Sequence, residues 1–236
     1  MEECSNRMTK ETCQLLGSRG SACKAFTKAG RKRIYNSLLL HISAVLMAYD
    51  KYKVGLPQQA LDAEFEDSKV TFRNGTTVID PSHRFSKTSY PTQTKLFQCI
   101  KDRSRDFQGF GTFIGRMEAI QVVKYESGGH YVPHFDWSPG SPRLSSIFAY
   151  VQANGTGGGT NFPELDRPEY GEWCDFVDCS VPLDDGVTFK PIPGNAIFWQ
   201  SVQPSGDVHP KTMHAGVPVI SGHKIGINVW AWKKDY

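Results

Sequence analysis

The chain has 236 residues, which is enough for one sizeable domain with a short extension and too few for two large domains. With 39% hydrophobic and 22% charged residues, its composition is typical of a soluble globular protein and excludes a largely disordered chain. The formal net charge of +3 is small, and a basic cluster, Lys24–Arg33, can supply much of it. The rest of the chain is close to neutral, so nucleic acid is not an expected partner.

The N-terminal part of the chain is expected to be helical or irregular. Apolar residues recur at helical spacing in Thr9–Leu16 and in Ile34–Tyr52, and a stretch rich in Gly and Ser, Gly17–Gly30, connects the two. We therefore divide the chain into an N-terminal extension, residues 1–65, and a main domain, residues 66–236.

Targeting and membrane signals are weak in this sequence. Met1 is followed by Glu2 and Glu3 rather than by a basic and then an apolar stretch, so no secretory signal is visible. The longest apolar run, Leu38–Ala48, is too short to cross a bilayer. No membrane span is expected, and an intracellular location is the default expectation.

Strand-like patterns begin after Asp67. Val70 to Phe72 and Thr77 to Ile79 lie on either side of the turn signal Asn74-Gly75, which predicts a short hairpin. A helix is then predicted over Pro91–Arg105, with Thr92 as its cap. Its buried stripe is expected to consist of Leu96, Phe97 and Ile100.

Short β-prone runs alternate with Gly and Pro from Glu118 to the end of the chain. This spacing is typical of a sandwich or barrel, so we expect a mainly β fold with flanking helices, in the α+β class. The predicted strands are Ala119–Tyr125, Ser146–Gln152, Val187–Phe189, Ala196–Trp199, Val217–Ile220 and Ile225–Trp232.

The six cysteines lack the paired spacing of a structural zinc site. Only Cys174 and Cys179 are near neighbours in the sequence. They can form a disulfide in an oxidising compartment or remain free thiols in the cytosol, and the sequence leaves both alternatives open.

The chemistry-bearing residues begin with His134 and Asp136. In an extended segment, side chains two residues apart leave the same face, so both can reach one metal ion, although most such pairs are surface or capping residues. His214 completes a set of two histidines and one carboxylate, which leaves half an octahedron free, as in non-haem iron(II) oxygenases. Zinc accepts the same ligands, but a structural zinc site is normally closed by four protein ligands, and the sequence offers no fourth.

Lys224 is a candidate partner for a buried carboxylate. It follows His214 by ten residues, and Gly222 can turn the chain between two strands so that both point inward. The cosubstrate 2-oxoglutarate chelates iron through its 2-oxo acid and has a remote carboxylate that needs a buried cation. The alternative is an ordinary surface lysine.

The segment Gln121–Asp136 resembles the first iron motif of the prolyl 4-hydroxylase alpha-subunit family. The resemblance covers about residues 66–236 and implies a double-stranded β-helix, or jelly-roll, core with the metal near one mouth. Four further segments resemble family motifs in the same order, namely Arg143–Val151, Gly157–Pro163, Pro193–Trp199 and His214–Trp230.

Residue roles follow from this resemblance. The iron ligands would be His134, Asp136 and His214, and Lys224 would pair with the distal carboxylate of 2-oxoglutarate. Tyr125 and Thr160 match positions that contact the cosubstrate; the alternatives are a strand-face Tyr and a turn Thr. Positions that face the peptide substrate in this family are occupied here by Tyr131, Arg143 and Trp230, each of which has packing or surface exposure as its alternative.

The resemblance predicts an Fe(II)- and 2-oxoglutarate-dependent dioxygenase that uses O₂ to hydroxylate a C–H bond of a prolyl residue, releases succinate and CO₂, and is kept active by ascorbate. Asp136 favours hydroxylation over halogenation, because halogenating relatives lack the carboxylate ligand. Lys224 argues against nucleic-acid demethylases, in which an arginine usually anchors the cosubstrate. By the same resemblance, the endoplasmic reticulum lumen becomes an alternative location.

Two departures leave the substrate open. The loop Trp137–Pro142 is short, and Trp232 stands where some family members carry a substrate-facing histidine. The alternatives to a peptidyl-prolyl hydroxylase are a hydroxylase of a free amino acid or other small metabolite, and an inactive jelly-roll binding module.

Overall fold

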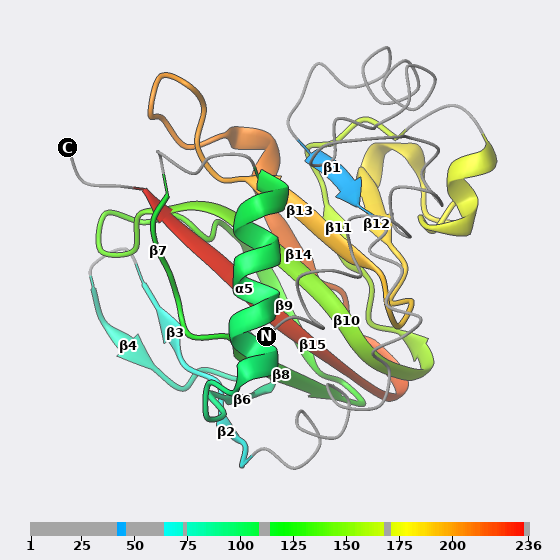
Figure 1. Ribbon diagram of the computed structural model, residues 1–236. Coiled ribbons are helices and arrows are strands. Elements are labelled where there is room, and N and C mark those ends of the chain that lie inside the picture. The colour runs from blue at the N-terminus through cyan, green and yellow to red at the C-terminus, as the bar shows by residue number, and fades with distance from the viewer. Residues whose placement is uncertain (1–41, 46–63, 73–74, 109–113, 168–170, 234–236) are drawn as a thin grey trace.

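The computed structural model describes residues 42–45, 64–72, 75–108, 114–167 and 171–233, and in these ranges the chain is mostly strands (Figure 1). The predicted mainly β class is therefore confirmed. Two antiparallel sheets form the body of the domain, and a small hairpin lies beside them. One α-helix, α5 (Lys95–Gln108), crosses the outer face of the larger sheet.

The larger sheet contains the longest strands of the molecule. β10 pairs with β15 along most of its length, and β8 and β13 continue the sheet on either side. The strand order is β1-β13-β10-β15-β8-β6-β2, with β7 also paired to β15. The bounds are β1 (Ile42–Val45), β2 (Glu66–Asp67), β6 (Lys87–Ser89), β7 (Ile114–Met117), β8 (Gln121–Glu126), β10 (Arg143–Gly157), β13 (Ala196–Gln200) and β15 (Val219–Lys233).

The smaller sheet has the order β12-β11-β14-β9-β5. Its strands are β5 (Arg84–Phe85), β9 (His130–His134), β11 (Thr160–Phe162), β12 (Val187–Phe189) and β14 (His214–Gly216). The predicted hairpin around Gly75 is also present, as β3 (Val70–Thr71) paired with β4 (Thr77–Val78). Three short 3₁₀ helices complete the described elements: η1 (Gly171–Asp175), η2 (Leu183–Asp185) and η3 (Pro210–Thr212).

Alternation along the long strands gives the larger sheet two apolar faces. On β10, Phe148 and Tyr150 pack inward against the smaller sheet, whereas Ile147 and Ala149 pack outward with the helix. β15 follows the same rule, with Ile225 and Ile227 outward and Lys224 between the sheets. A period of two therefore decides which side chains of β15 can reach the interior.

Helix α5 covers the outer face with the predicted stripe. Phe97 and Ile100 are buried in the outer cluster, and Leu96 packs against it. The predicted helix bounds were too early, because the helix begins at Lys95 and ends at Gln108. Thr92 therefore lies too far upstream to cap it.

The predicted helix Ile34–Tyr52 is wrong at Ile42–Val45, which form strand β1. β1 pairs in register with β13, and Ile42 lies opposite Trp199. The open edge of β13 supplies backbone partners to a segment with β-branched ends, and this tertiary pairing overrides the local helical spacing. The other residues of the predicted helices, 9–16, 34–41 and 46–52, lie outside the described residues.

The C-terminal strands differ from the prediction at two points. The predicted strand Val217–Ile220 is interrupted before Val219, where Pro218 has no N–H to donate to a ladder. Gly222 does not turn the chain between two strands but lies inside β15 opposite Gly155, with a positive φ of 76°. Lys224 thus belongs to the long strand β15, and the turn toward β14 comes earlier.

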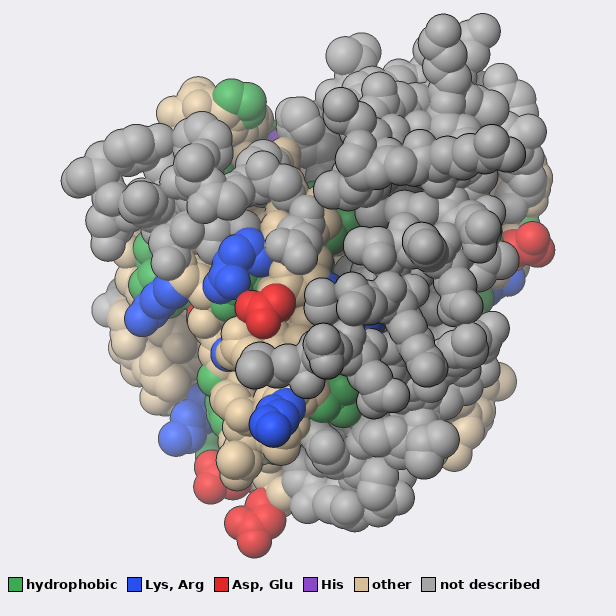
Figure 2. Space-filling view, in the orientation of Figure 1, with side chains coloured by type: hydrophobic (Ala, Val, Ile, Leu, Met, Phe, Trp, Pro, Cys, Tyr) green, Lys and Arg blue, Asp and Glu red, His purple; other side chains and the backbone are tan. Residues whose placement is uncertain are grey.

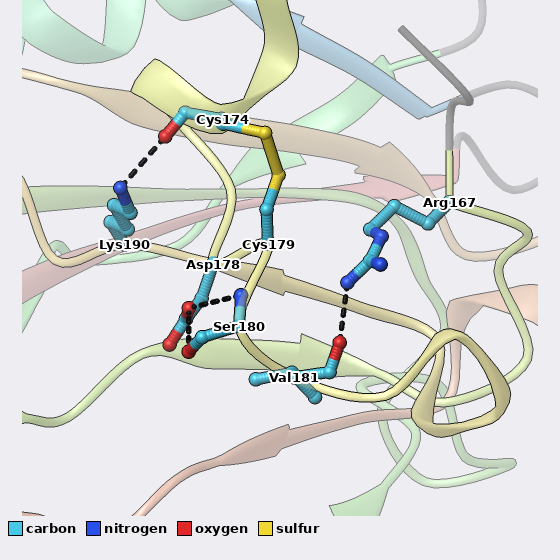
Figure 3. The surroundings of a disulfide bond; sticks show 7 residues. All are labelled: Arg167, Cys174, Asp178, Cys179, Ser180, Val181 and Lys190. Carbon is cyan, nitrogen blue, oxygen red and sulfur yellow. Dashed lines mark hydrogen bonds between the residues drawn. A yellow bond between two sulfur atoms is a disulfide. The ribbon is translucent and has the colours of Figure 1, made fainter. Parts of the chain in front are cut away.

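A disulfide joins Cys174 to Cys179 in the connection from β11 to β12 (Figure 3). Lys190 donates a hydrogen bond to the carbonyl oxygen of Cys174, at 2.7 Å, and Ser180 donates one to Asp178, at 2.6 Å. The structure thus selects the bonded alternative for these cysteines. The loop is held at its base, on the side of the smaller sheet.

The described surface carries mixed charge on the face drawn in Figure 2, where Lys and Arg side chains lie beside Asp and Glu rather than in a continuous basic patch. Among the described residues, no helix is long and apolar enough to cross a membrane.

Gly226 provides a test of the packing between β15 and β10. A Cβ built on Gly226 would lie 2.3 Å from Cζ and 2.8 Å from Cε2 of the buried Phe148 ring. We expect Gly226→Ala to lower the free energy of unfolding by about 1–3 kcal/mol through overpacking, measured by urea denaturation. Gly171→Ala is the matched control, because its Cβ would meet no atom within 4 Å; equal stability of the two variants would contradict the packing described.

Candidate active site

Three side chains with metal-binding atoms meet at one point of the smaller sheet. His134 ends β9, Asp136 follows two residues later, and His214 begins β14, directly opposite His134 in the strand register. One ligand atom from each residue lies within 4.8 Å of the other two. Strand pairing therefore brings together residues that are 80 positions apart in the sequence.

Both imidazoles are oriented as metal ligands require. Nδ1 of His134 is 2.9 Å from the carbonyl oxygen of Val132, and Nδ1 of His214 is 2.9 Å from that of Thr212. Because a carbonyl oxygen can only accept, each Nδ1 carries a proton and donates it, which leaves Nε2 as the ring nitrogen that can face a metal. Burial, together with the neighbouring His214, lowers the pKa of His134 to about 3, so this ring stays neutral.

Among the described hydrogen bonds to the carboxylate of Asp136, all are accepted by one oxygen, Oδ2. Ser146 and Trp230 donate hydrogen bonds to Oδ2, at 2.5 Å and 3.1 Å. Burial by itself would raise the pKa of Asp136, but His214 and Arg143 outweigh that effect and hold it below the usual value. An ionised carboxylate and two imidazoles whose Nδ1 atoms are engaged by backbone carbonyls suit a divalent cation such as Fe(II), so the residues present fit the metal.

Lys224 is a buried cation without a carboxylate partner among the described residues. Its side chain is 2% exposed, and Nζ donates one hydrogen bond, to the carbonyl oxygen of Gly158 at 2.6 Å. Nζ also lies 4.5 Å from the ring centroid of Tyr125. Desolvation lowers the pKa of Lys224 to about 7. A buried ammonium with two unused donors is a site for an anion.

Tyr125 and Thr160, the two predicted cosubstrate contacts, line the same cavity as Lys224. Tyr125 lies opposite Lys224 in the pairing of β8 with β15, and burial raises the pKa of its phenol, which keeps the proton available for donation. Thr160 accepts a hydrogen bond from Tyr150, at 2.7 Å, so its own hydroxyl proton is available to a ligand.

The three predicted substrate-facing residues also line this cavity. The Tyr131 ring stacks on His134, with centroids 3.6 Å apart. The Arg143 guanidinium lies 3.6 Å from the ring centroid of Trp230, and Trp230 bonds to Asp136. Tyr131, Arg143 and Trp230 therefore contact the metal ligands or each other, in addition to facing the open space.

The cavity has a volume of about 1420 Å³ and extends well beyond the three ligands. Its wall continues along the strands β2 to β4 on one side and reaches Ser138 and Ser141 on the other. The three candidate metal ligands and Lys224 thus line one cavity together with these outer residues.

Three residues of the site were missed in the sequence. Ser146, which holds Asp136, lies two residues before Phe148 on β10, so strand alternation could have identified it. Glu118 pairs with Arg143 through two hydrogen bonds. Arg84 lies 4.7 Å from the Tyr131 ring centroid on a strand of only two residues, which leaves no periodic signal. Glu118 and Arg84 are brought to the site by contacts between distant segments, which local sequence patterns do not predict.

Lys224 makes the stability of the ligand-free protein depend on pH. Its pKa falls from 10.5 to about 7 on folding, so between these values the unfolded chain binds more protons and stability rises with pH. We expect Lys224→Met to remove up to about 1.4 kcal/mol per pH unit from the slope of the unfolding free energy in this window, measured by denaturation at several pH values.

The same variant should also bind 2-oxoglutarate at least tenfold more weakly, because it lacks the ammonium. Lys190→Met is its matched control, since Lys190 also bonds to a carbonyl but lies outside the cavity. An unchanged pH slope together with an unchanged affinity would show that Lys224 is not the anion site.

Comparison with known proteins agrees with this geometry. The pattern of the 2OG-Fe(II) oxygenase superfamily matches residues 120–232, which include all three candidate ligands and Lys224. The chain is 30% identical over 156 residues to probable prolyl 4-hydroxylase 3 of Arabidopsis thaliana, covering 60% of this chain and 51% of that protein. It is 33% identical over 170 residues to human prolyl 4-hydroxylase subunit alpha-3, covering 66% and 27%.

Solved structures show the same fold. A viral collagen prolyl hydroxylase from Paramecium bursaria Chlorella virus-1, in complex with 2OG, matches with a TM-score of 0.56 at 23% identity, covering 81% of this chain and 95% of that one. A prolyl hydroxylase from Trichoplax adhaerens, in complex with a hypoxia inducible factor peptide, matches with a TM-score of 0.56 at 15% identity, covering 89% and 93%.

The predicted jelly-roll is thereby confirmed. The chain spans about half the length of the plant relative and about a quarter of the human one. In sequence, the chain is thus similar to prolyl 4-hydroxylase-like members of the 2OG-Fe(II) oxygenase superfamily.

Proposed function

We propose that this protein is an Fe(II)- and 2-oxoglutarate-dependent dioxygenase that hydroxylates a C–H bond of a prolyl residue and releases succinate and CO₂. One observation carries the proposal. Two histidines and an aspartate meet in the same cavity as a buried lysine that lacks a described carboxylate partner. That combination suits a divalent metal and a dicarboxylate held together.

Bound by His134, Asp136 and His214, iron would activate O₂, which supplies the oxidising power that hydroxylation of an unactivated C–H bond requires. The chain's own residues provide position. Nδ1 of each histidine is fixed by a backbone carbonyl, which prevents the rings from rotating away from the centre. Only three protein ligands are offered in the described part of the chain, which leaves room for the cosubstrate and O₂.

Lys224 would fix the far end of 2-oxoglutarate. Its ammonium is already desolvated by aromatic rings, and the hydroxyls of Tyr125 and Thr160 can donate to the same carboxylate. Binding of the anion favours the charged form of the lysine, which offsets part of its burial cost. These donors define one end of the cosubstrate, and the metal defines the other.

Two observations support a peptide substrate: the extent of the cavity wall and the similarity to prolyl hydroxylases. The wall includes residues on β2 and β3 as well as the segment around Ser141, which is more space than a free amino acid needs. The curated relatives are prolyl 4-hydroxylases, and the Trichoplax adhaerens enzyme holds a peptide fragment. By the same family argument, we propose ascorbate as the reductant that restores iron after unproductive turnover.

A free amino acid is the second candidate, and Arg84 favours it. This guanidinium lines the cavity, is held by the hydroxyls of Ser86 and Thr88, and pairs with no carboxylate among the described residues. A cation at this point can bind the carboxylate of a small substrate. A peptide would use the outer wall of the cavity, whereas a free amino acid would use Arg84.

An anaerobic titration with Fe(II) and 2-oxoglutarate tests the metal centre. We expect a visible charge-transfer band in the wild-type protein and its loss in His214→Ala, because two ligands are too few to hold the iron in place for chelation. His130→Ala is the matched control, since His130 lies on the same strand as His134 but does not line the cavity. A band that survives in His214→Ala would exclude this residue as a ligand.

Succinate release then separates the substrate classes. We expect release coupled to a hydroxylated product with a proline-rich peptide and little release with free proline, measured by mass spectrometry. The opposite order would favour the small-molecule hydroxylase. Absence of both the charge-transfer band and turnover in the wild-type protein would favour a binding module instead.

A further inference from the structure

A continuous set of side chains leads outward from the metal-ligand Asp136. Trp230 donates its indole N–H to Oδ2 of Asp136, and the guanidinium of Arg143 covers the Trp230 ring at 3.6 Å. The Nη1 atom of Arg143 is 3.8 Å from the other carboxylate oxygen, Oδ1. No described residue donates a hydrogen bond to Oδ1. Oδ2 is also 4.0 Å from Nε2 of His214, so the two carboxylate oxygens have different neighbours, and Arg143 is the described cation beside Oδ1.

Glu118 holds Arg143 from the opposite side. It accepts hydrogen bonds from Nε and Nη2 of Arg143, at 2.7 Å and 3.1 Å, and a third from the indole N–H of Trp232. The side chains of Glu118 and Arg143 are 17% and 20% exposed, so solvent weakens this pair only in part. Nε and Nη2 of Arg143 are thus engaged by Glu118, and Nη1 is the nitrogen that lies near Asp136.

Trp232 completes the arrangement. It lies opposite Arg143 in the pairing of β15 with β10 and opposite Arg116 in the pairing of β15 with β7. The Arg116 guanidinium lies 3.6 Å from the centre of the Trp232 ring and covers it, and the ring is not part of the cavity wall. Trp232 therefore acts on Glu118 and not on a substrate.

The geometry has a direct consequence for the metal. A guanidinium prefers a close, bidentate contact with a carboxylate, and Nη1 of Arg143 is already 3.8 Å from Oδ1 of Asp136. An Arg143 released by Glu118 would bond to Oδ1 of Asp136 and compete with the cation for that carboxylate. Since Glu118 is anchored by Trp232, both residues oppose this competition.

We propose that Trp232 and Glu118 are positioning residues that hold Arg143 away from Asp136 and so keep the carboxylate available to the metal. The inference rests on the proposed metal centre. It gives a role to Trp232, which stands at a position where some members of the prolyl 4-hydroxylase family carry a substrate-facing histidine. In this chain the position supports the metal-ligating carboxylate.

Co(II) binding, followed by its visible absorption without O₂ or turnover, tests the proposal. We expect Trp232→Phe and Glu118→Gln each to weaken Co(II) binding, by up to about tenfold, because loss of an outer support of a metal ligand typically has this effect. The double variant should be no weaker than Glu118→Gln, because both changes act through Arg143. Ser180→Ala is the control: it loses a hydrogen bond to the carboxylate of Asp178 in the disulfide loop, and it should bind Co(II) like the wild-type protein.

Removing Arg143 distinguishes a positioning role of Trp232 and Glu118 from a merely structural one. Adding Arg143→Met to Glu118→Gln should restore Co(II) affinity toward the wild-type value, whereas a merely structural role predicts further loss. Thermal unfolding checks that each variant is folded; if Glu118→Gln is not, Trp232→Phe with and without Arg143→Met carries the same test. Wild-type affinity in the folded single variants, or no recovery on removing Arg143, would overturn the proposal.

The result also separates this inference from the proposed function. If the wild-type protein binds Co(II) and the variants do not differ from it, only the role of Trp232 and Glu118 fails. If the wild-type protein itself does not bind Co(II), the metal centre and this inference fail together.

Discussion

The pairing of β9 with β14 is the interaction on which the rest of the site depends. It places His134 directly opposite His214, and the two-residue step from His134 to Asp136 then brings the carboxylate to the same point. A shift of one residue in this register would turn His214 to the opposite face of its strand and separate the ligands. The smaller sheet therefore acts as the frame of the metal centre, while the larger sheet supplies Lys224 and the residues that hold Asp136.

Burial gives the two ends of the site opposite tasks. At the metal end, desolvation keeps His134 neutral, and the surrounding charges keep Asp136 ionised, which is the protonation state that a divalent cation requires. At the other end, Lys224 is buried against aromatic rings without a described counter-charge, which costs stability until an anion binds. Under the proposed function, binding of a dicarboxylate at Lys224 would therefore raise the folding stability of the domain.

The sequence predicted the site better than it predicted the strand boundaries. His134, Asp136, His214 and Lys224 are polar residues whose chemistry is specific and whose spacing suits extended strands, so they could be recognised without coordinates. Gly222 was interpreted as a turn, whereas its positive φ serves a bulge inside β15, because either use satisfies the same local signal. The strand at Ile42–Val45 and the contact from Glu118 to Trp232 depend on distant partners, which local patterns do not encode.

In the proposed complex, one divalent cation is held by three side chains while Lys224 binds the far carboxylate of the same cosubstrate. Anomalous diffraction from crystals grown anaerobically with Fe(II) and 2-oxoglutarate measures this directly. We expect a single iron peak within bonding distance of His134, Asp136 and His214, with continuous density for the cosubstrate from the iron to the Lys224 ammonium. An iron peak elsewhere, or cosubstrate density that does not reach Lys224, would contradict this arrangement.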